Sequence, residues 1–409
     1  MNVEQRIEVV REICAFEGRL AGTDAERRAA ADIARRLEGL GRQTEIEPTY
    51  VHPQWPLVQA LHCLLALAGS LAALEYPPIG FAIVLLSALS MYLDLNARFY
   101  LLRRLFFRRA SQNVVSRGRG SGRGGTLVLC ANYDAGRSGS AYGRGWCGAG
   151  ARVARLFPAP FSPARLVFWS VAVLLPLIGL RMAGVEDNWI SILQLPPTLV
   201  RVVAIFLLID IQLSPVAAGA NANASGVATV LALTEELAEE PPAELDIWVV
   251  LGGAGGALNT GMREFVRSHR DELDRESTWF LSLDAVGEGA VRFEVSQGPI
   301  VSYGMASRLT ELGAAIAEAD AERDEPAASP LKSGYASGSL SAVLARYPAT
   351  TITCLPPGAA TPPRANTLAD TPGELDPDSL ERAHRFALEL VRALDRDLTR
   401  RAQREAAVV

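Results

Sequence analysis

The stretch GANANASGVATVLALTEELAEEPPAELDIWVVLGGAGG, residues 219–256, contains two different signals of secondary structure. Residues 225–239 are mostly apolar residues and good helix formers, which predicts a helix. After two prolines, the run LDIWVVLGG at 245–253 is apolar and rich in β-branched and aromatic residues, which predicts a buried strand. A helix followed closely by a buried strand is the repeating unit of an α/β protein.

The same alternation continues on both sides of this stretch. Further β-type runs occupy residues 126–132, 278–284, 291–297 and 350–354, and helical patterns occupy 4–40, 261–274, 304–320 and 378–398. Such alternation predicts a three-layer α/β domain with a central, mostly parallel mixed sheet that helices cover on both faces. We therefore expect functional side chains at the carboxyl ends of the strands.

Composition limits the classes of partner and compartment. The 409 residues are 49% hydrophobic, and the formal net charge is only −5. At this length we expect one large α/β domain of about 250 to 300 residues with additional segments. The balanced charge gives no indication of nucleic-acid binding. The five cysteines show no C-x-x-C spacing, which argues against a disulfide framework and favours a reducing compartment.

Two pairs of apolar runs predict transmembrane helical hairpins. The first pair is LVQALHCLLALAGSLAAL (57–74) and IGFAIVLLSALSMYL (79–93); the second is LVFWSVAVLLPLIGL (166–180) and residues 189–209, which Pro196, Pro197 and Arg201 interrupt. The first two runs are short for the roughly 20 residues that span a bilayer, so a hairpin buried in protein is the alternative. We assign 57–95 and 164–212 to the hairpins, and 1–56, 97–160 and 214–409 to the α/β domain.

An arginine-rich segment follows the first hairpin. Its arginines are Arg98, Arg103, Arg104, Arg108, Arg109, Arg117, Arg119 and Arg123, and Arg144, Arg152, Arg155 and Arg165 precede the second hairpin. Basic residues beside membrane helices mark the cytoplasmic side. We expect a multi-pass protein of the cell membrane with its soluble domain in the cytoplasm. Within this segment, FYLLRRLFFRR (99–109) resembles an interfacial helix.

The order of motifs in the α/β part resembles the di-zinc aminopeptidase family, which includes bacterial leucyl aminopeptidases, glutamate carboxypeptidases and glutaminyl cyclases. The motifs are RLAGTDAERRAAADIARRL (19–37), QNVV (112–115), ANYDAG (131–136), GANANASGVA (219–228), GGAGGALNTGMREF (252–265), LSLDAVGEG (281–289) and NTLADTPGELDPDSLERA (366–383). The resemblance covers roughly residues 14–47, 112–136 and 217–396. It implies a zinc-exopeptidase-like fold.

Most positions that hold zinc in this family carry unsuitable residues in this chain. The resemblance places the first ligand His at Asn132, the bridging Asp at Ala222, the general base and the next ligand Glu at Gly255 and Gly256, the second ligand Asp at Asp284, and the last His at Asn366. Two zinc ions need several carboxylate or imidazole ligands, and their bound water needs a base. Only Asp284 remains, so we predict no intact catalytic residue, no metal and no cofactor.

Two acidic residues remain as possible pocket residues. Asp134 follows Asn132 by two positions and is expected to accept hydrogen bonds from nearby backbone N–H groups. Asp284 is expected to pair with an arginine or to be hydrated, and it is a weak indication of a small cationic or hydroxylated ligand.

Other candidate residues have simpler interpretations. His62 reads as a tolerated polar residue of a membrane arm, and His269 and His384 read as residues on helix surfaces. Cys130 is typical of a buried strand thiol. The glycines at 120, 122 and 125 match GxGxxG, but they precede a strand, which favours a flexible loop over dinucleotide binding. Ser225 has no candidate His partner for nucleophilic catalysis.

These observations leave three functional hypotheses. The first is a multi-pass membrane pseudoenzyme whose peptidase-like domain binds an unknown protein or small-molecule ligand without hydrolysis. The second is an active metallo-aminopeptidase or related hydrolase with an altered metal site. The third is a scaffold for a membrane complex. The lipid bilayer is the one partner that all three share.

Overall fold

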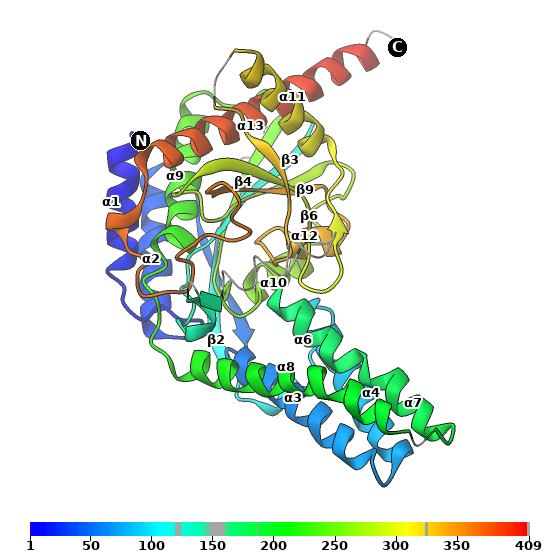
Figure 1. Ribbon diagram of the computed structural model, residues 1–409. Helices are drawn as coiled ribbons and strands as arrows, with labels where there is room; N and C mark the ends of the chain where they lie inside the picture. Colours follow the sequence, from blue (N-terminus) through cyan, green and yellow to red (C-terminus); the bar gives the residue numbers. More distant parts are fainter. Residues whose placement is uncertain are drawn as a thin grey trace.

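The computed structural model describes residues 1–118, 124–143, 145–146, 160, 162–185, 187–323 and 326–406. Figure 1 shows a rounded α/β body from which an arm of helices projects. The helices of the body are α1 (Val3–Cys14), α2 (Asp24–Gly39), α9 (Ser225–Glu239), α10 (Thr260–Ser268), α11 (Arg308–Glu322), α12 (Leu340–Leu344) and α13 (Pro377–Ala406), with a short π-helix η3 (Ala220–Ala224). The arm consists of α3 (Trp55–Ala72), α4 (Pro77–Leu95), α6 (Pro163–Ala172), α7 (Leu174–Met182) and α8 (Asn188–Leu213).

The described strands form one mixed sheet that is parallel at its centre. They are β1 (Glu45–Val51), β2 (Arg109–Ser116), β3 (Gly125–Asn132), β4 (Leu245–Gly252), β5 (Thr278–Leu283), β6 (Ala290–Gln297), β7 (Tyr303–Gly304), β8 (Ser329–Lys332) and β9 (Ala349–Leu355). The order is β1-β2-β4-β3-β5-β9-β6-β7, and β8 pairs with β6. Strands β4, β3, β5 and β9 are parallel, whereas β1, β2, β6 and β7 pair antiparallel at the flanks.

The central strands are buried on both faces, as their continuous apolar sequences predict. In β3, Leu127 and Leu129 point into a core that helices α1, α2, α9 and α13 cover. The alternate residues Val128 and Cys130 point into a second core, which α10 and the segment around Tyr347 cover. Helices therefore cover both faces of the sheet, which confirms the predicted three-layer α/β class.

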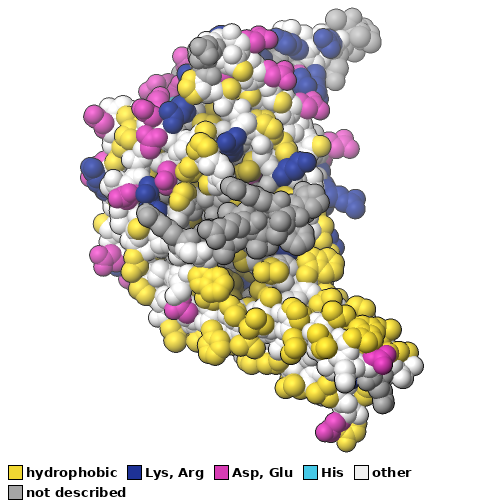
Figure 2. Space-filling model, viewed as in Figure 1, with side chains coloured by type: hydrophobic (Ala, Val, Ile, Leu, Met, Phe, Trp, Pro, Cys, Tyr) yellow, Lys and Arg dark blue, Asp and Glu magenta, His cyan; other side chains and the backbone are white. Residues whose placement is uncertain are grey.

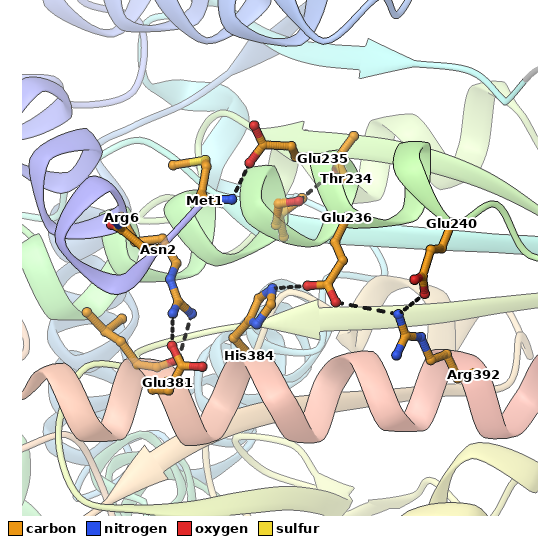
Figure 3. A network of polar contacts seen from close by, with 12 residues as sticks. Met1, Asn2, Arg6, Thr234, Glu235, Glu236, Glu240, Glu381, His384 and Arg392 are labelled. Atoms are coloured by element: carbon orange, nitrogen blue, oxygen red, sulfur yellow. Dashed lines mark hydrogen bonds and ion pairs between the residues drawn. The ribbon is translucent and has the colours of Figure 1, made fainter.

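Ion pairs join α1 and α9 to the long helix α13 (Figure 3). The buried Arg6 donates to the carbonyl oxygen of Leu380 at 3.1 Å and pairs with Glu381. At the other end of the contact, Arg392 donates to Glu240 at 2.6 Å. Because these contacts join segments far apart in the sequence, they hold α13 across the body.

His384 lies in the same network but is buried, so the predicted surface position is wrong. Burial lowers the pKa of His384 to about 4, with the charge of Arg6 as a further cause. The imidazole is therefore neutral near pH 7. Its Nε2 atom lies 3.5 Å from a carboxylate oxygen of Glu236, and at neutral pH this contact is not an ion pair.

The arm contains four spans that are long and apolar enough to cross a membrane: Trp55–Ala72, Pro77–Leu95, Pro163–Met182 and Asn188–Leu213. Small residues let α3 and α4 pack closely, since a Cβ atom on Gly80 would lie 2.5 Å from the carbonyl oxygen of Gly69. Helix α8 is continuous through Pro196 and Pro197, although these residues interrupt its apolar sequence. Neighbouring helices can compensate for proline inside an apolar helix.

Several other predicted elements differ from the structure. The helical pattern at 4–40 forms two helices, α1 and α2, which residues 15–23 separate. Residues 99–109 do not form an interfacial helix: a short 3-10 helix, η1 (Leu102–Leu105), precedes strand β2. The motif QNVV lies within β2, and the pairing partner β1 was not predicted. Strand β1 contains Pro48 and charged residues, which makes its sequence a poor strand signal.

Candidate functional site

The candidate site lies at the carboxyl ends of the parallel strands β3, β4 and β5. Asn132 is the last residue of β3 and pairs in register with Gly252, the last residue of β4. Asp284 directly follows β5, which is the neighbour of β3 on its other side. Parallel pairing therefore places Asn132, Asp284 and the loop after β4 at one edge of the sheet, as the sequence order predicted.

The Asn132 side chain occupies the space beside Gly255. Its Nδ2 atom donates to Oδ1 of Asn259 at 2.8 Å, and its buried Oδ1 atom has no hydrogen-bond partner among the described residues. A Cβ atom placed on Gly255 would lie 2.5 Å from Cγ of Asn132 and 2.8 Å from its Nδ2. Gly255 therefore cannot carry any side chain, including a catalytic glutamate, unless Asn132 or the backbone moves.

Carboxylates bind three consecutive N–H groups of the loop after β4. Asp134, which is fully buried, accepts from Gly255 N at 2.7 Å and from Gly256 N at 3.0 Å. Glu26 accepts from Ala254 N at 3.0 Å. Both acids thus hold the loop by its backbone, and Asp134 has the backbone contacts that its position predicted.

Glu26 is a site residue that the sequence did not reveal. It is buried on α2, and it also accepts hydrogen bonds from the Ser111 hydroxyl at 2.7 Å and from Gly22 N at 2.6 Å. Burial, together with the charge of Asp134, raises the pKa of the Glu26 carboxyl; burial also raises the pKa of Asp134. No sequence signal distinguishes Glu26 from an exposed helix glutamate, because its hydrogen-bond partners come from three different segments.

The loop after β4 has an unusual backbone and a second set of neighbours. Ala254, Leu258 and Asn259 all have positive φ angles, 53°, 63° and 53°, which non-glycine residues rarely adopt. Leu258 packs against a cluster of apolar residues of the arm that includes Met91 and Leu174. The same short loop therefore contacts both the candidate site and the projecting helices.

Asp284 is held by the backbone. Its Oδ2 atom accepts from Gly338 N at 3.1 Å, so the partner is a backbone group and not an arginine, the first of the two expected alternatives. Burial raises the pKa of Asp284 to about 6, and the nearby charge of Asp134 adds to this shift. Burial also raises the pKa of the neighbouring Glu294 to about 8, and Glu294 accepts a hydrogen bond from the Ser337 hydroxyl at 2.8 Å.

Ala222 and Asn366 lie on the segments that face the strand ends. Asp370 accepts from Asn221 N at 2.7 Å and from Ala222 N at 3.1 Å, which joins the π-helix η3 to the loop of Asn366. A Cβ atom on Gly136 would lie 2.3 Å from Oδ1 of Asn366. Asn366 therefore packs directly against the segment that follows Asp134.

The structure joins the sequence-selected positions into one region. Asn132 contacts the Gly255 position directly, and Gly136 lies between Gly256 and Asn366. A Cβ atom on Gly338, which binds Asp284, would lie 3.9 Å from Nδ2 of Asn132. Ala222 connects to this group through Asp370.

This set of side chains does not fit two zinc ions. Its members at the strand ends are amides, glycines and one carboxylate, Asp284, and the other carboxylate, Asp134, is already bound to two backbone N–H groups. Among the described residues, no group of three or more His, Cys, Asp or Glu side chains is arranged to hold a metal ion. Zinc sites need several anionic or imidazole ligands at about 2 Å.

The remaining candidates have structural surroundings. His269 is buried, which corrects the predicted surface position: its ring stacks on Phe265 with centroids 4.4 Å apart, and the hydrogen bond to Glu47 raises its pKa. Cys130 is buried in β3 as predicted. The Ser225 hydroxyl donates to the carbonyl oxygen of Asn221 at 2.6 Å, which is a helix contact. Residues 120 and 122 of the GxGxxG match lie outside the described residues.

Comparison with known proteins finds a family model that matches part of this chain. Residues 208–391 match the family model described as peptidase family M28. The chain is related to peptidase family M28. No curated protein matches it. The matched segment of this M28 relative begins near the end of α8 and includes η3, the loop after β4 and Asp284.

Solved structures share the fold of the M28 relative at low sequence identity. Glutaminyl cyclase from Tannerella forsythia has a TM-score of 0.55 and 14% identity, covering 96% of this chain and 98% of that one. A zinc aminopeptidase from Bacillus subtilis has a TM-score of 0.54 and 12% identity, covering 95% of this chain and 94% of that one. LapB from Legionella pneumophila has a TM-score of 0.53 and 11% identity, covering 97% of this chain and 72% of that one. These likenesses show a zinc-exopeptidase-like fold.

Proposed function

We propose that this chain is a multi-pass membrane protein whose M28-like domain binds a ligand or a protein partner without hydrolysing it. The observation that carries the proposal is the loop after β4. At the positions that the family resemblance assigns to a base and a metal ligand, the loop has Gly255 and Gly256, and their N–H groups bind Asp134. A hydrolase needs a base within hydrogen-bond reach of the attacking water, and glycine supplies none.

Zinc content and peptidase activity test this proposal. We expect the purified protein to contain well below one zinc per chain and to release no product from N-terminal amino acid amides, because one free carboxylate cannot hold zinc. Metal analysis and an amide-hydrolysis assay measure both. Treatment with a chelator should leave the unfolding temperature unchanged.

The variant Asp284→Ala serves as the matched control. It should show the same zero rate as the wild type, since Asp284 has no metal to hold in the proposed state. Near two zinc ions per chain, lost together with activity on chelation, would contradict the proposal. An activity that Asp284→Ala abolishes would instead support an altered hydrolase.

Membrane insertion of the arm is supported by the reversed polarity of its helices. Figure 2 shows hydrophobic side chains over the arm and charged side chains over the body. The exposed side chains of the arm are large and apolar; they include Leu64, Leu71, Leu85, Leu89, Trp169, Ile192, Leu199 and Phe206. Exposing such an apolar surface to water is unfavourable, whereas contact with lipid acyl chains is favourable.

Several polar side chains of the arm are buried inside it and bond to other side chains or to backbone carbonyls of the arm. His62 Nε2 lies 2.8 Å from the Ser90 hydroxyl oxygen, and Ser87 donates to the His62 carbonyl at 2.7 Å. The buried Arg201 donates to the Ser170 carbonyl at 2.7 Å and to the Thr198 hydroxyl at 2.8 Å. Polar groups inside a bilayer are expected to face a bundle interior and to find partners there.

We further propose that the body lies in the cytoplasm. Helix α4 is followed by the arginines of residues 98–109, on the side where the arm meets the body, whereas the turns at the far end of the arm carry Glu75 and Asp187. Positive residues beside membrane helices favour the cytoplasmic side. Of the arginines in the predicted basic segments, those at 119, 123, 144, 152 and 155 lie outside the described residues.

Cysteine labelling of intact cells tests this orientation. A membrane-impermeant maleimide should label the variant Glu75→Cys before lysis, and Arg270→Cys, in the body, only after lysis. The wild type, with its native cysteines, gives the background. The reverse pattern of labelling would place the body outside the cytoplasm and overturn the orientation.

A further inference from the structure

A cavity of ≈ 310 Å³ lies where the first helical pair joins the α/β body. Three segments line it: residues 50–52 at the end of β1, residues 99–108 after α4, and one face of α10 from Thr260 to Arg267. Because α3 begins at Trp55 and α4 ends at Leu95, the cavity lies at the level where both helices leave the body. Its volume is at the lower end of the range for small-molecule sites.

The lining of this cavity is strongly cationic. Four arginines contribute to it: Arg104, Arg108, Arg263 and Arg267. The one carboxylate in the lining, Glu264, forms an ion pair with Arg267. Arg104 and Arg108 are exposed and form no ion pair with any described residue. The cavity therefore has a net positive charge and two guanidinium groups that are available to an anion.

Aromatic rings hold these guanidinium groups in place. The guanidinium carbon of Arg108 lies 4.2 Å from the ring centroid of Tyr50, and that of Arg104 lies 4.5 Å from that of Phe99. Arg263 lies 4.4 Å from the ring centroid of Tyr100 and donates to the carbonyl oxygen of Arg98 at 3.1 Å. Stacking restricts the side chains while leaving their N–H groups free to bind, so the site is partly preorganised.

Apolar side chains surround the same cationic segment. Leu105 and Phe107 are 74% and 59% exposed, and both lie between Arg104 and Arg108 in the sequence. A small soluble anion would make no contact with these apolar side chains. A phospholipid would contact both groups, the arginines through its phosphate and Leu105 and Phe107 through its acyl chains. Aromatic residues and arginine at one level are also typical of the membrane interface.

We propose that this cavity binds the phosphate group of an anionic phospholipid. The inference rests on the membrane placement of the arm proposed above and does not depend on whether the M28-like domain is catalytic. Arg104 and Arg108 contact the phosphate, and Arg263 completes the cationic wall. Guanidinium groups suit this role because they donate two parallel hydrogen bonds to a phosphate.

Titration of the full chain in a non-ionic detergent tests the site. The probes are dioctanoyl phosphatidylglycerol, dioctanoyl phosphatidylcholine and inorganic phosphate, and thermophoresis measures binding. We expect the anionic lipid to bind at least about tenfold more tightly than the zwitterionic lipid, and the variant Arg104→Gln/Arg108→Gln to lose that preference. The variant Arg270→Gln/Arg275→Gln removes the same charge from exposed arginines elsewhere and should keep it.

Each other outcome counts against the proposal. Equal affinity for the two lipids, or an unchanged preference in Arg104→Gln/Arg108→Gln, overturns it. Phosphate that binds as tightly as phosphatidylglycerol would identify a free anion as the ligand. If the variant fails to fold, the wild type still decides: its affinity for phosphatidylglycerol should fall with added salt, and an affinity independent of salt overturns the proposal. Because detergent replaces the bilayer, this test is separate from the labelling test of membrane orientation.

Discussion

The variant Arg103→Met is expected to lower the unfolding temperature more than any other single change in the arm. Arg103 and Asp94 are both buried, and the guanidinium group binds the carboxylate through two hydrogen bonds of 2.8 and 2.7 Å. Removing the arginine leaves Asp94 buried without a cation. Such a loss costs about 3 to 5 kcal/mol. Thermal unfolding in detergent should show a fall in midpoint of roughly 3 to 6 °C.

Two further variants separate this effect from a general loss of charge. Arg104→Met removes the adjacent, exposed arginine and should change the midpoint little, because Arg104 forms no ion pair with any residue that the structure describes. Asp94→Asn/Arg103→Met removes both charges and keeps an acceptor for Gln59, which donates to Asp94 at 2.8 Å. It should recover part of the loss. A midpoint of Arg103→Met equal to that of the wild type would show that the buried pair is not formed.

The same arginine links the arm to the candidate site. Its Nη1 atom donates to the carbonyl oxygen of Ala257 at 3.4 Å, a weak contact, and the next residue, Leu258, packs on the arm. Ala257 lies in the loop whose N–H groups bind Asp134 and Glu26. The arm and the loop after β4 are therefore in direct contact through Arg103 and Leu258.

The centre of the fold could be predicted from sequence because its signals are local. The parallel strands β3, β4, β5 and β9 are buried on both faces; the first three are mostly apolar, and β9 is rich in β-branched residues. The flanking strands β1 and β2 were missed. Strand β1 is partly exposed and β2 begins with polar residues, so neither shows an apolar run at its start. Their pairing depends on contacts between residues 45–51 and 109–116, which no local pattern reveals.

The sequence predicted some positions of the candidate site but not the contacts between them. Motif order placed Asn132 and Asp284 at the ends of β3 and β5, because both motifs overlap apolar strand runs. Asn366 lies in the segment between β9 and α13. The sequence does not show that Gly255 cannot carry a side chain, because this restriction depends on the position of the Asn132 amide. Glu26 and the link through Leu258 were missed for the same reason: each joins segments more than 80 residues apart.

The second large effect is expected at Gly226, within the motif at 219–228. A Cβ atom on Gly226 would lie 2.2 Å from the carbonyl oxygen of Leu283 and 3.4 Å from Cβ of Ala131. Helix α9 therefore rests directly on the backbone of β5. In Gly226→Ala the gain in helix propensity, about 1 kcal/mol, is smaller than the cost of displacing backbone, so we expect a net loss of about 2 kcal/mol or more.

Gly39→Ala provides the matched control, because a Cβ atom on Gly39 would have no neighbour within 4 Å. This variant should unfold at or slightly above the wild-type temperature. In Gly226→Ala the shift of α9 should also weaken the hydrogen bonds from Val286 N to Ser225 and from Gly287 N to Asn221, which are 3.1 and 2.7 Å long. Hydrogen exchange at these two amides should accelerate beside Asp284. Unchanged exchange together with an unchanged midpoint would show that α9 and β5 are not in contact at this glycine.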